Sequence, residues 1–364
     1  MRIYQPLVFI LLFILQINLS SAQIKPIRIA VAGMTHGHVG WILNASGTVH
    51  DFELVGFSES NEDLANRLID QYELDPGLWY HNIDEMLQEV KPEAVCAFGS
   101  IFEHLMVVEK CAPLGIHVMV EKPLAVNLEH AKNMKQLAER YGIYLLTNYE
   151  TTWYPSNHKI NEMQEAGIIG GIRKIVIHDG HQGPIEIGCS TEFLAWLTDP
   201  IMNGGGAIID FGCYGANLAT WIMNDQKPIS VTAVTQQFKP KMYPNVDDEA
   251  TIILGYPQTQ AIIQASWNWP YSRKDIEVYG EKGYLFGPNG HTLVSKLGDD
   301  NEKSRQLALL PAPENNPFSY FVSVINGTTD PSESLSSLQN NMIVVEILSA
   351  AVQSAREGKT IFLR

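Results

Sequence analysis

Residues 27–40, which read Ile-Arg-Ile-Ala-Val-Ala-Gly-Met-Thr-His-Gly-His-Val-Gly, decide the fold of this chain. Apolar residues alternate in the first half and predict a strand, and the glycine-rich turn leads into a predicted helix from Val39. This arrangement is typical of dinucleotide binding, because glycines let the backbone approach the pyrophosphate and a helix N-terminus supplies free N–H groups. Gly37-x-x-Gly40 fits the second half of G-x-G-x-x-G, whereas Gly33 lies two residues too early, so a purely structural turn stays open as an alternative.

A carboxylate after the second predicted strand, residues 52–57, supports a dinucleotide site. Glu59 follows Gly33 by 59 − 33 = 26 residues, against roughly 20 in the usual motif. A carboxylate there accepts hydrogen bonds from both ribose hydroxyls and repels a 2′-phosphate, which favours NAD over NADP. The alternative for Glu59 is a solvated residue at the end of a strand.

Strands and helices alternate through the first 150 residues. We expect strands at 25–32, 52–57, 94–98, 117–120 and 144–148, and helices at 39–44, 61–72, 81–89, 102–114 and 128–141. Such alternation implies βαβ units and a parallel sheet. The prediction for residues 23–148 is a doubly wound Rossmann domain that binds NAD(P).

The pattern changes after about residue 150. We expect strands at 172–177, 229–238, 250–256, 260–267, 275–279 and 283–286, and helices at 156–166, 206–224 and 336–357. Short turns between most of these strands favour antiparallel pairing. The fold class is therefore α/β, with a C-terminal α+β substrate and oligomerisation domain over 149–364 that has an open, mainly antiparallel sheet. Its last helix could pack back on the first domain.

Length and composition exclude several classes of protein. The chain has 364 residues, with 45% hydrophobic and 18% charged side chains, which suits two globular domains. Its net charge of −15 would repel a phosphate backbone, so nucleic acid is not an expected partner. Four cysteines are too few for a disulfide scaffold, and the absence of a C-x-x-C pair argues against a zinc knuckle.

The first 22 residues predict a cleaved signal peptide. Arg2 precedes the apolar run Leu7–Leu15, and Ser20 and Ala22 fit a signal-peptidase site before Gln23. The run is far shorter than the ~20 residues that span a bilayer, and an uncleaved anchor is the alternative. We therefore expect export, to the periplasm, with no membrane span after cleavage.

Three further motifs resemble those of one known family. Glu121-Lys122-Pro123 follows a buried strand, His104 lies upstream, and residues 204–214 read Gly-Gly-Gly-Ala-Ile-Ile-Asp-Phe-Gly-Cys-Tyr. With the glycine loop ahead of them, they resemble the glucose–fructose oxidoreductase/inositol dehydrogenase (Gfo/Idh/MocA) family, from about residue 27 to the C-terminus. The resemblance implies a Rossmann domain and an open antiparallel sheet domain with the nicotinamide between them. It also implies sugars, polyols or related cyclic alcohols as substrates, and a homodimer or homotetramer.

The resemblance further implies which residues form the site. The reaction centre would be lined by Lys122, Asp210 and Tyr214. The cofactor would be bound by Gly33, Thr35, His36, Gly37, His38, Glu59, His104, Glu121 and Lys122. Residue 214 is tyrosine rather than the commoner histidine, as in the glucose–fructose oxidoreductase and dihydrodiol dehydrogenase branches. An arginine often found after the sixth strand is absent from residues 148–155.

These residue types suit the oxidation of a carbinol, which needs a base for the hydroxyl proton and a hydride acceptor that the cofactor supplies. A phenol with a pKa of ~10 is a weak base, and we expect the ammonium of Lys122 to lower the pKa of Tyr214 and to stabilise an alkoxide. Asp210 precedes Tyr214 by four residues and should share its helix face, where it could orient the substrate or Lys122. The alternative for Tyr214 is a core aromatic.

Other side chains are candidate substrate contacts, namely Tyr154, His181, Trp267 and Trp269. Aromatic rings pack on the C–H faces of sugars, although the two tryptophans could instead be an edge-strand cluster. His178 and His181 would point to opposite sides of a strand, so we expect no metal site there.

The leading hypothesis is an exported, NAD-dependent oxidoreductase that acts on a hydroxyl of a small carbohydrate. A second hypothesis is a redox-neutral glycosidase or lyase that works through a transient keto-sugar with tightly bound cofactor, because an exported enzyme has no evident NAD pool. A third is a catalytically inactive sugar-binding protein. The third is disfavoured because Lys122, Asp210 and Tyr214 all keep chemically competent side chains.

Overall fold

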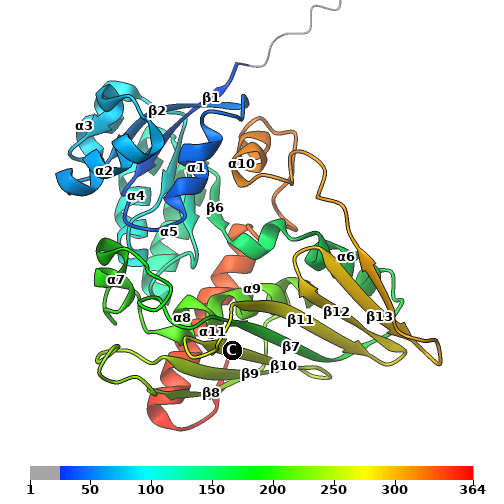
Figure 1. Cartoon of the computed structure of the whole chain (residues 1–364). Helices are drawn as coiled ribbons and strands as arrows, with labels where there is room; N and C mark the ends of the chain where they lie inside the picture. The colour runs from blue at the N-terminus through cyan, green and yellow to red at the C-terminus, as the bar shows by residue number, and fades with distance from the viewer. Residues whose placement is uncertain (1–24, 364) are drawn as a thin grey trace, which may run out of the picture.

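The computed structural model describes residues 25–363, which form two sheets with helices packed around them (Figure 1). The predicted signal peptide, residues 1–22, lies outside the described residues. Within 25–363, every helix is too short or too polar to cross a bilayer.

The first sheet has six parallel strands in the order β3-β2-β1-β4-β5-β6. They are β1 (Ile27–Ala32), β2 (Phe52–Ser58), β3 (Trp79–Tyr80), β4 (Ala94–Ala97), β5 (His117–Glu121) and β6 (Leu145–Asn148). The central strands are mostly apolar because both faces of the sheet are covered. The doubly wound prediction is confirmed, and the carboxyl ends of the strands form the edge at which such folds bind ligands.

The helices of this domain begin and end at recognisable local signals. They are α1 (Val39–Ala45), α2 (Glu62–Tyr72), α3 (Ile83–Val90), α4 (His104–Cys111) and α5 (Leu128–Tyr141). The side chains of Asn61, Asn82 and Asn127 each accept a hydrogen bond from a backbone N–H in the first turn of α2, α3 and α5. Gly142 ends α5 in a left-handed conformation. These caps explain why the predicted bounds are close to the observed ones.

The second sheet has nine strands in the order β14-β13-β12-β11-β7-β10-β9-β8-β15. They are β7 (Ile172–Gly180), β8 (Ser230–Gln236), β9 (Glu249–Gly255), β10 (Gln260–Ser266), β11 (Arg273–Gly280), β12 (Gly283–Asn289), β13 (Thr292–Leu297), β14 (Lys303–Gln306) and β15 (Ile361–Phe362). All neighbours pair antiparallel except β7 and β10, so the mainly antiparallel prediction is confirmed. The sequence prediction missed β13, β14 and β15; β14 is fully exposed and β15 has two residues, so neither carries a strong apolar alternation.

The predicted helix over 206–224 is two helices, α8 (Ala207–Asp210) and α9 (Gly212–Ile222). Next to the break at Phe211, the carbonyl oxygen of Asp210 accepts hydrogen bonds from Lys122 Nζ and Cys213 Sγ, each at 3.2 Å. The prediction of one continuous helix is therefore wrong. Asp210 and Tyr214 nevertheless reach the same cavity.

Three helices, α6 (Pro155–Glu165), α9 and α11 (Leu338–Glu357), cover one face of the second sheet (Figure 1). The remaining helix beside the cavity is α7 (Thr191–Leu197). Helix α11 packs on β8 and α9 and also on α5 of the first domain, so it joins the two domains.

Helix α10 (Pro317–Ile325) follows the second sheet in the chain but belongs to the core of the first domain. Phe318 and Phe321 are buried there together with Ile29 and Val31 of β1. The Rossmann domain is therefore completed by a segment that lies far beyond residue 148.

Candidate active site

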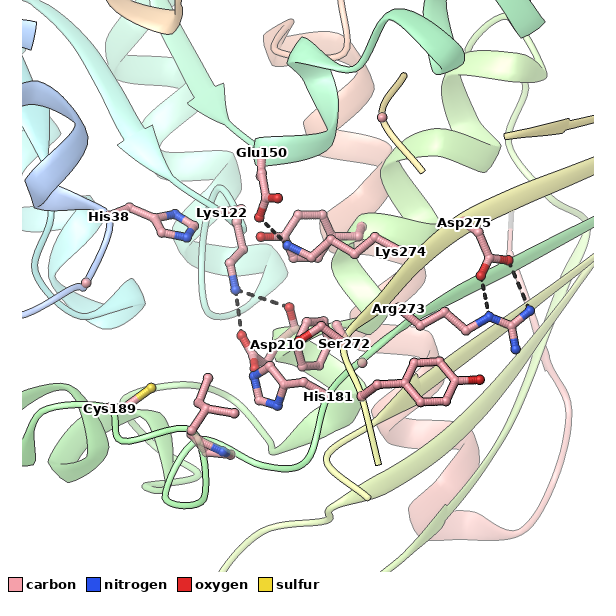
Figure 2. A pocket seen from close by; sticks show the side chains of 18 of the residues that line it. His38, Lys122, Glu150, His181, Cys189, Asp210, Ser272, Arg273, Lys274 and Asp275 are labelled. Carbon is pink, nitrogen blue, oxygen red and sulfur yellow. Dashed lines mark hydrogen bonds and ion pairs between the residues drawn. The ribbon is translucent and has the colours of Figure 1, made fainter. Parts of the chain in front are cut away.

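A cavity of about 880 Å³ lies where the two domains meet (Figure 2). The first domain contributes residues 36–38 of the glycine loop and Lys122, which follows β5. The second domain contributes His181, Asp210 and Tyr214. The cavity thus combines the ligand-binding edge of a doubly wound sheet with side chains from the second domain.

Lys122 and Asp210 form a buried ion pair in this cavity. Lys122 Nζ lies 2.5 Å from Asp210 Oδ1, and Trp267 Nε1 donates to Asp210 Oδ2 at 2.9 Å. Burial would lower the pKa of Lys122, but the carboxylate of Asp210 more than offsets this and raises it. Burial would likewise raise the pKa of Asp210, but Lys122 lowers it. Both groups are therefore charged at neutral pH, and the structure brings these two predicted residues into contact.

Glu121 is a buried carboxylate that holds His38 at the glycine loop. Its Oε1 accepts a hydrogen bond from Asn148 Nδ2 at 2.6 Å, and its Oε2 lies 3.0 Å from His38 Nδ1. Burial opposes ionisation, yet His38 and the other neighbours lower the pKa of Glu121 to about 2. The neighbouring His36 is neutral because burial lowers its pKa well below 6.5, and its Nδ1 accepts from the backbone N–H of His38. The structure places all three residues at the junction of the glycine loop and the cavity.

The ring of Tyr214 is buried and lines the cavity. Lys274 Nζ lies 4.6 Å and Lys122 Nζ 5.1 Å from the ring centroid, so two ammonium groups lie against the ring. Burial raises the pKa of the Tyr214 phenol well above 10.0, and Glu150 adds to the rise. The expectation that Lys122 lowers this pKa is therefore wrong, because the Lys122 ammonium is bound to Asp210.

His181 follows β7, and the backbone fixes its tautomer. Its Nδ1 accepts a hydrogen bond from the N–H of Gly183 at 2.9 Å, so the neutral ring carries its proton on Nε2. Burial lowers the pKa of His181, which keeps the ring neutral. His181 can therefore donate to a substrate, but it can accept a proton only by losing its backbone hydrogen bond. Figure 2 shows the ring beside Asp210.

Sequence reasoning missed four charged residues of the cavity, namely Glu150, Arg273, Lys274 and Asp275. Glu150, which follows β6, forms an ion pair with Lys274 of β11 (Figure 2), and the hydroxyl of Tyr154 donates to Glu150. Tyr154, a predicted substrate contact, lines the cavity. Glu150 was detectable, since it comes just after β6 at the ligand-binding edge. Lys274 was missed because β11 was predicted to begin at residue 275.

Trp267 and Trp269 are absent from the described residues that line the cavity, so their predicted role in stacking on a substrate here is wrong. Trp267 is fully buried at the end of β10 and binds Asp210 instead. Trp269 packs beside Arg273, whose guanidinium carbon lies 5.9 Å from its ring centroid. His178 is paired with Asp275, at 2.8 Å between Nδ1 and Oδ1, and so has a different partner from His181.

A smaller cavity of about 280 Å³ lies along the same glycine loop and is lined by Gly33, Thr35, Glu59 and His104 among others. Gly33 has φ +72°, and a Cβ there would lie 2.8 Å from Gly99, so this glycine is required by the turn. A Cβ on Gly37 would meet nothing within 4 Å, so this glycine leaves open space for a ligand. The loop therefore allows the close backbone approach that a pyrophosphate needs.

Two polar side chains complete the cofactor cavity. Glu59 accepts hydrogen bonds from the backbone N–H groups of Met34 and Asn61 at 2.9 and 2.8 Å, so it also orders the glycine loop. His104 Nδ1 lies 3.2 Å from the carbonyl oxygen of Leu124, and burial lowers the pKa of His104 to about 4. Its Nε2 is buried without a partner in the part of the chain that the structure describes. An unpaired buried acceptor beside an open glycine loop fits a bound dinucleotide.

A parallel sheet with a dinucleotide cavity that adjoins a buried lysine–aspartate pair defines the class of Rossmann-fold oxidoreductases. Residues 27–149 match the family model described as oxidoreductase family, NAD-binding Rossmann fold, and residues 157–286 match the GFO/IDH/MocA C-terminal domain. The chain therefore belongs to the Gfo/Idh/MocA family of oxidoreductases.

Curated relatives are dehydrogenases. Trans-1,2-dihydrobenzene-1,2-diol dehydrogenase of Xenopus laevis is 27% identical over 186 residues, 51% of this chain and 52% of that protein, so the chain spans about half the length of this relative. Myo-inositol 2-dehydrogenase of Thermotoga maritima is 22% identical over 293 residues, 75% of this chain and 78% of that protein. D-xylose 1-dehydrogenase [NADP(+)] of Haloarcula marismortui is 23% identical over 273 residues, 72% of each chain.

Solved structures share the fold. An inositol dehydrogenase homolog from Azotobacter vinelandii, complexed with NAD+, has a TM-score of 0.80 at 19% identity and covers 93% of this chain and 98% of its own. An aldose-aldose oxidoreductase from Caulobacter crescentus, complexed with glycerol, has a TM-score of 0.79 at 19% identity and covers 93% of this chain and 100% of its own.

Proposed function

We propose that this protein transfers a hydride between a nicotinamide cofactor and a hydroxyl-bearing carbon of a neutral sugar or sugar derivative. The observation that carries the proposal is the buried Lys122–Asp210 pair beside Tyr214, in a cavity that shares the glycine loop with the cofactor cavity. The cofactor, when bound, accepts or returns the hydride.

The side chains of the cavity bind the substrate, stabilise its alkoxide and exchange its hydroxyl proton. Lys122 keeps its charge, because Asp210 raises its pKa, and it stabilises the alkoxide that forms when the substrate hydroxyl loses its proton. Asp210, held by Trp267, keeps the ammonium in place. Tyr214 exchanges the hydroxyl proton, and His181 donates from Nε2 to a second hydroxyl of the substrate.

The charges of the cavity favour a neutral substrate. Its three cations are each paired with an acid, in the ion pairs Lys122–Asp210, Lys274–Glu150 and Arg273–Asp275. A substrate carboxylate or phosphate would have to share its cation with one of these acids, and the two negative charges would repel each other. Hydroxyl groups can bind such pairs without displacing either partner.

The family assignment leaves NAD and NADP open, and we propose NAD because Glu59 lines the cavity beside the second strand. Glu59→Ala should bring the affinities for NAD and NADP closer together, since the repulsion of a 2′-phosphate is lost. Affinity for both cofactors should also fall, because Glu59 binds the glycine loop through Met34. Calorimetric titration of both cofactors measures this, and equal affinities in the unmutated protein would contradict the role of Glu59.

The named relatives are dehydrogenases, which favours net hydride transfer over the redox-neutral glycosidase or lyase. The test is mass spectrometry of natively purified protein for retained NAD(H), followed by NADH formation with a panel of neutral sugars and polyols. Stoichiometric NADH supports the proposal. Release of an aglycone without net NADH contradicts it in favour of the redox-neutral reaction.

Export and self-association belong to the same proposal. The apolar run Leu7–Leu15 and the small residues at 20 and 22 support cleavage near Ala22 and an exported protein. The resemblance to the family supports a homodimer or homotetramer. N-terminal sequencing and light scattering of the purified protein test the two points; a retained Met1 or a monomer contradicts them.

A further inference from the structure

A cavity of about 640 Å³ adjoins the active-site cavity, and no step of the proposed reaction uses it. Glu150 and Tyr154 line both cavities. The turn between β12 and β13 contributes Gly290 to the active-site cavity and His291 to its neighbour. The wall between the two spaces therefore consists mainly of Tyr154 and the glutamate to which it donates a hydrogen bond.

The lining of this outer cavity combines aromatic rings with uncharged polar groups. The aromatic members are Trp41, Trp153, Tyr154 and Phe318, and the polar members include Asn44, Thr48, His291 and Asn316. Aromatic rings pack on the C–H faces of sugars, while amides and hydroxyls bond to their hydroxyl groups. The volume lies within the range of ~300–1,000 Å³ that small-molecule sites occupy.

Aromatic side chains connect the outer cavity to the reaction centre. Trp41 stacks on His38 with ring centroids 3.9 Å apart and planes 14° apart, and His38 lines the active-site cavity. The ring of Tyr154 packs on the backbone of Gly290, where an added Cβ would lie 3.0 Å from it. A ligand that extends past Tyr154 from the active-site cavity therefore meets Trp41 and Trp153 next.

The polar groups of the outer cavity suit a neutral ligand with hydroxyl groups. The carboxamide oxygen of Asn316 accepts hydrogen bonds from the N–H groups of Phe318 and Ser319 at the start of α10. Any bond that Asn316 makes to a ligand therefore uses its Nδ2 donors. In the described lining, the ionisable groups are His291, Tyr154 and Glu150, and Glu150 is paired with Lys274.

We infer that the outer cavity is a subsite for the second unit of a neutral glycoside. The sugar that is oxidised lies at Lys122 and Asp210, and the sugar linked to it lies against Trp41 and Trp153. The identity of the reacting ring rests on the proposed function; the outer subsite rests on the cavity itself.

The test variant is Asn44→Trp. Asn44 is exposed on α1 and lines the outer cavity but not the active-site cavity, so an indole there fills the proposed subsite. Asn133→Trp is the matched control, because Asn133 is also an exposed helical asparagine, on α5, and lies outside the linings of both cavities. The probes are glucose and xylose, each compared with its disaccharides, namely cellobiose, maltose and xylobiose. The readouts are kcat/KM for NADH formation and calorimetric binding of the same sugars.

We expect a disaccharide to exceed its monosaccharide by about tenfold or more in kcat/KM, because a filled subsite contributes binding energy. Asn44→Trp should abolish this advantage and leave monosaccharide turnover unchanged, and Asn133→Trp should change neither. Equal turnover of mono- and disaccharides, or an equal loss for both in Asn44→Trp, overturns the subsite and leaves the oxidoreductase function standing. If no sugar is oxidised, disaccharide binding that Asn44→Trp abolishes supports the subsite while the proposed reaction fails. Absence of disaccharide binding overturns the subsite.

Discussion

The substrate proton has few possible acceptors in the active-site cavity. The ammonium of Lys122 is already protonated, and both carboxylate oxygens of Asp210 accept hydrogen bonds from Lys122 and Trp267. His181 carries a fixed proton on Nε2. Among the residues assigned to the reaction centre, Tyr214 remains, and it is a neutral phenol at pH 7 because burial raises its pKa. A neutral phenol donates a proton more readily than it accepts one. The structure therefore suits carbonyl reduction at neutral pH and alcohol oxidation at higher pH.

Tyr214→Phe tests this assignment. The substitution keeps the ring and removes the exchangeable proton, and positioned proton transfer is typically worth ~10²–10⁴ in rate, so kcat should fall by about that factor. Cofactor affinity should hardly change, because the ring is kept and Tyr214 is not among the described residues that line the cavity along the glycine loop. Steady-state kinetics and cofactor titration measure the two effects. Near-native kcat in Tyr214→Phe would move the proton transfer to another group.

The pH dependence should differ between the two reaction directions. Oxidation of the alcohol needs the phenolate, whose fraction grows up to about tenfold per pH unit below the phenol pKa, so the rate should rise from neutral to alkaline pH. Reduction of the carbonyl uses the neutral phenol and should stay flat over the same range. Initial rates in both directions across this range provide the measurement. A rise with pH that persists in Tyr214→Phe would show that a different group titrates.

At the scale of elements, substitutions at two glycines distinguish a role in ligand binding from a role in packing. Gly37→Ala places a Cβ in open space, so we expect unchanged stability and weaker cofactor binding, because the Cβ enters the path of the pyrophosphate. Gly215→Ala, in α9, places a Cβ 2.3 Å from Ile263 of β10 and should destabilise the protein by about 1–3 kcal/mol. Urea unfolding and cofactor titration of both variants test the contrast. Loss of stability in Gly37→Ala would contradict it.

Some of these elements could be predicted from the sequence, and others could not. Helices with asparagine caps, such as α2 and α5, and apolar strands, such as β4, were predictable because their signals are local. The hydrogen bond from Lys122 to the carbonyl oxygen of Asp210, next to the break at Phe211, was not, because the two residues lie 88 positions apart in sequence. The role of Trp267 was also hidden, because a tryptophan suits a buried hydrogen-bond partner of Asp210 as well as it suits a surface on which a sugar stacks. The resemblance to the family placed Lys122, Asp210 and Tyr214 in one site, but the burial that raises the pKa of Tyr214 required the structure.

At the scale of the whole molecule, the two domains are built to hold one site between them. The cavity takes Lys122 from the first domain and Asp210 from the second, so their ion pair forms only when the domains are docked. Helix α11 packs on both domains, and α10 returns from the second sheet to the core of the first. The chain crosses between the domains more than once, which favours cooperative unfolding over independent domain motion.

Phe321→Ala tests this architecture. Phe321 is fully buried in α10, in one hydrophobic cluster with Met34 of the glycine loop, although more than 280 residues separate the two in sequence. Removing its ring should cost about 3–5 kcal/mol of unfolding free energy and should also weaken cofactor binding, because packing beneath the loop is lost. Phe362→Ala is the control, since Phe362 of β15 is 71% exposed and should change neither quantity. Urea unfolding followed by fluorescence, together with cofactor titration, measures both. If Phe321→Ala destabilised the protein but left cofactor affinity at the native value, α10 would support the fold without reaching the cofactor loop.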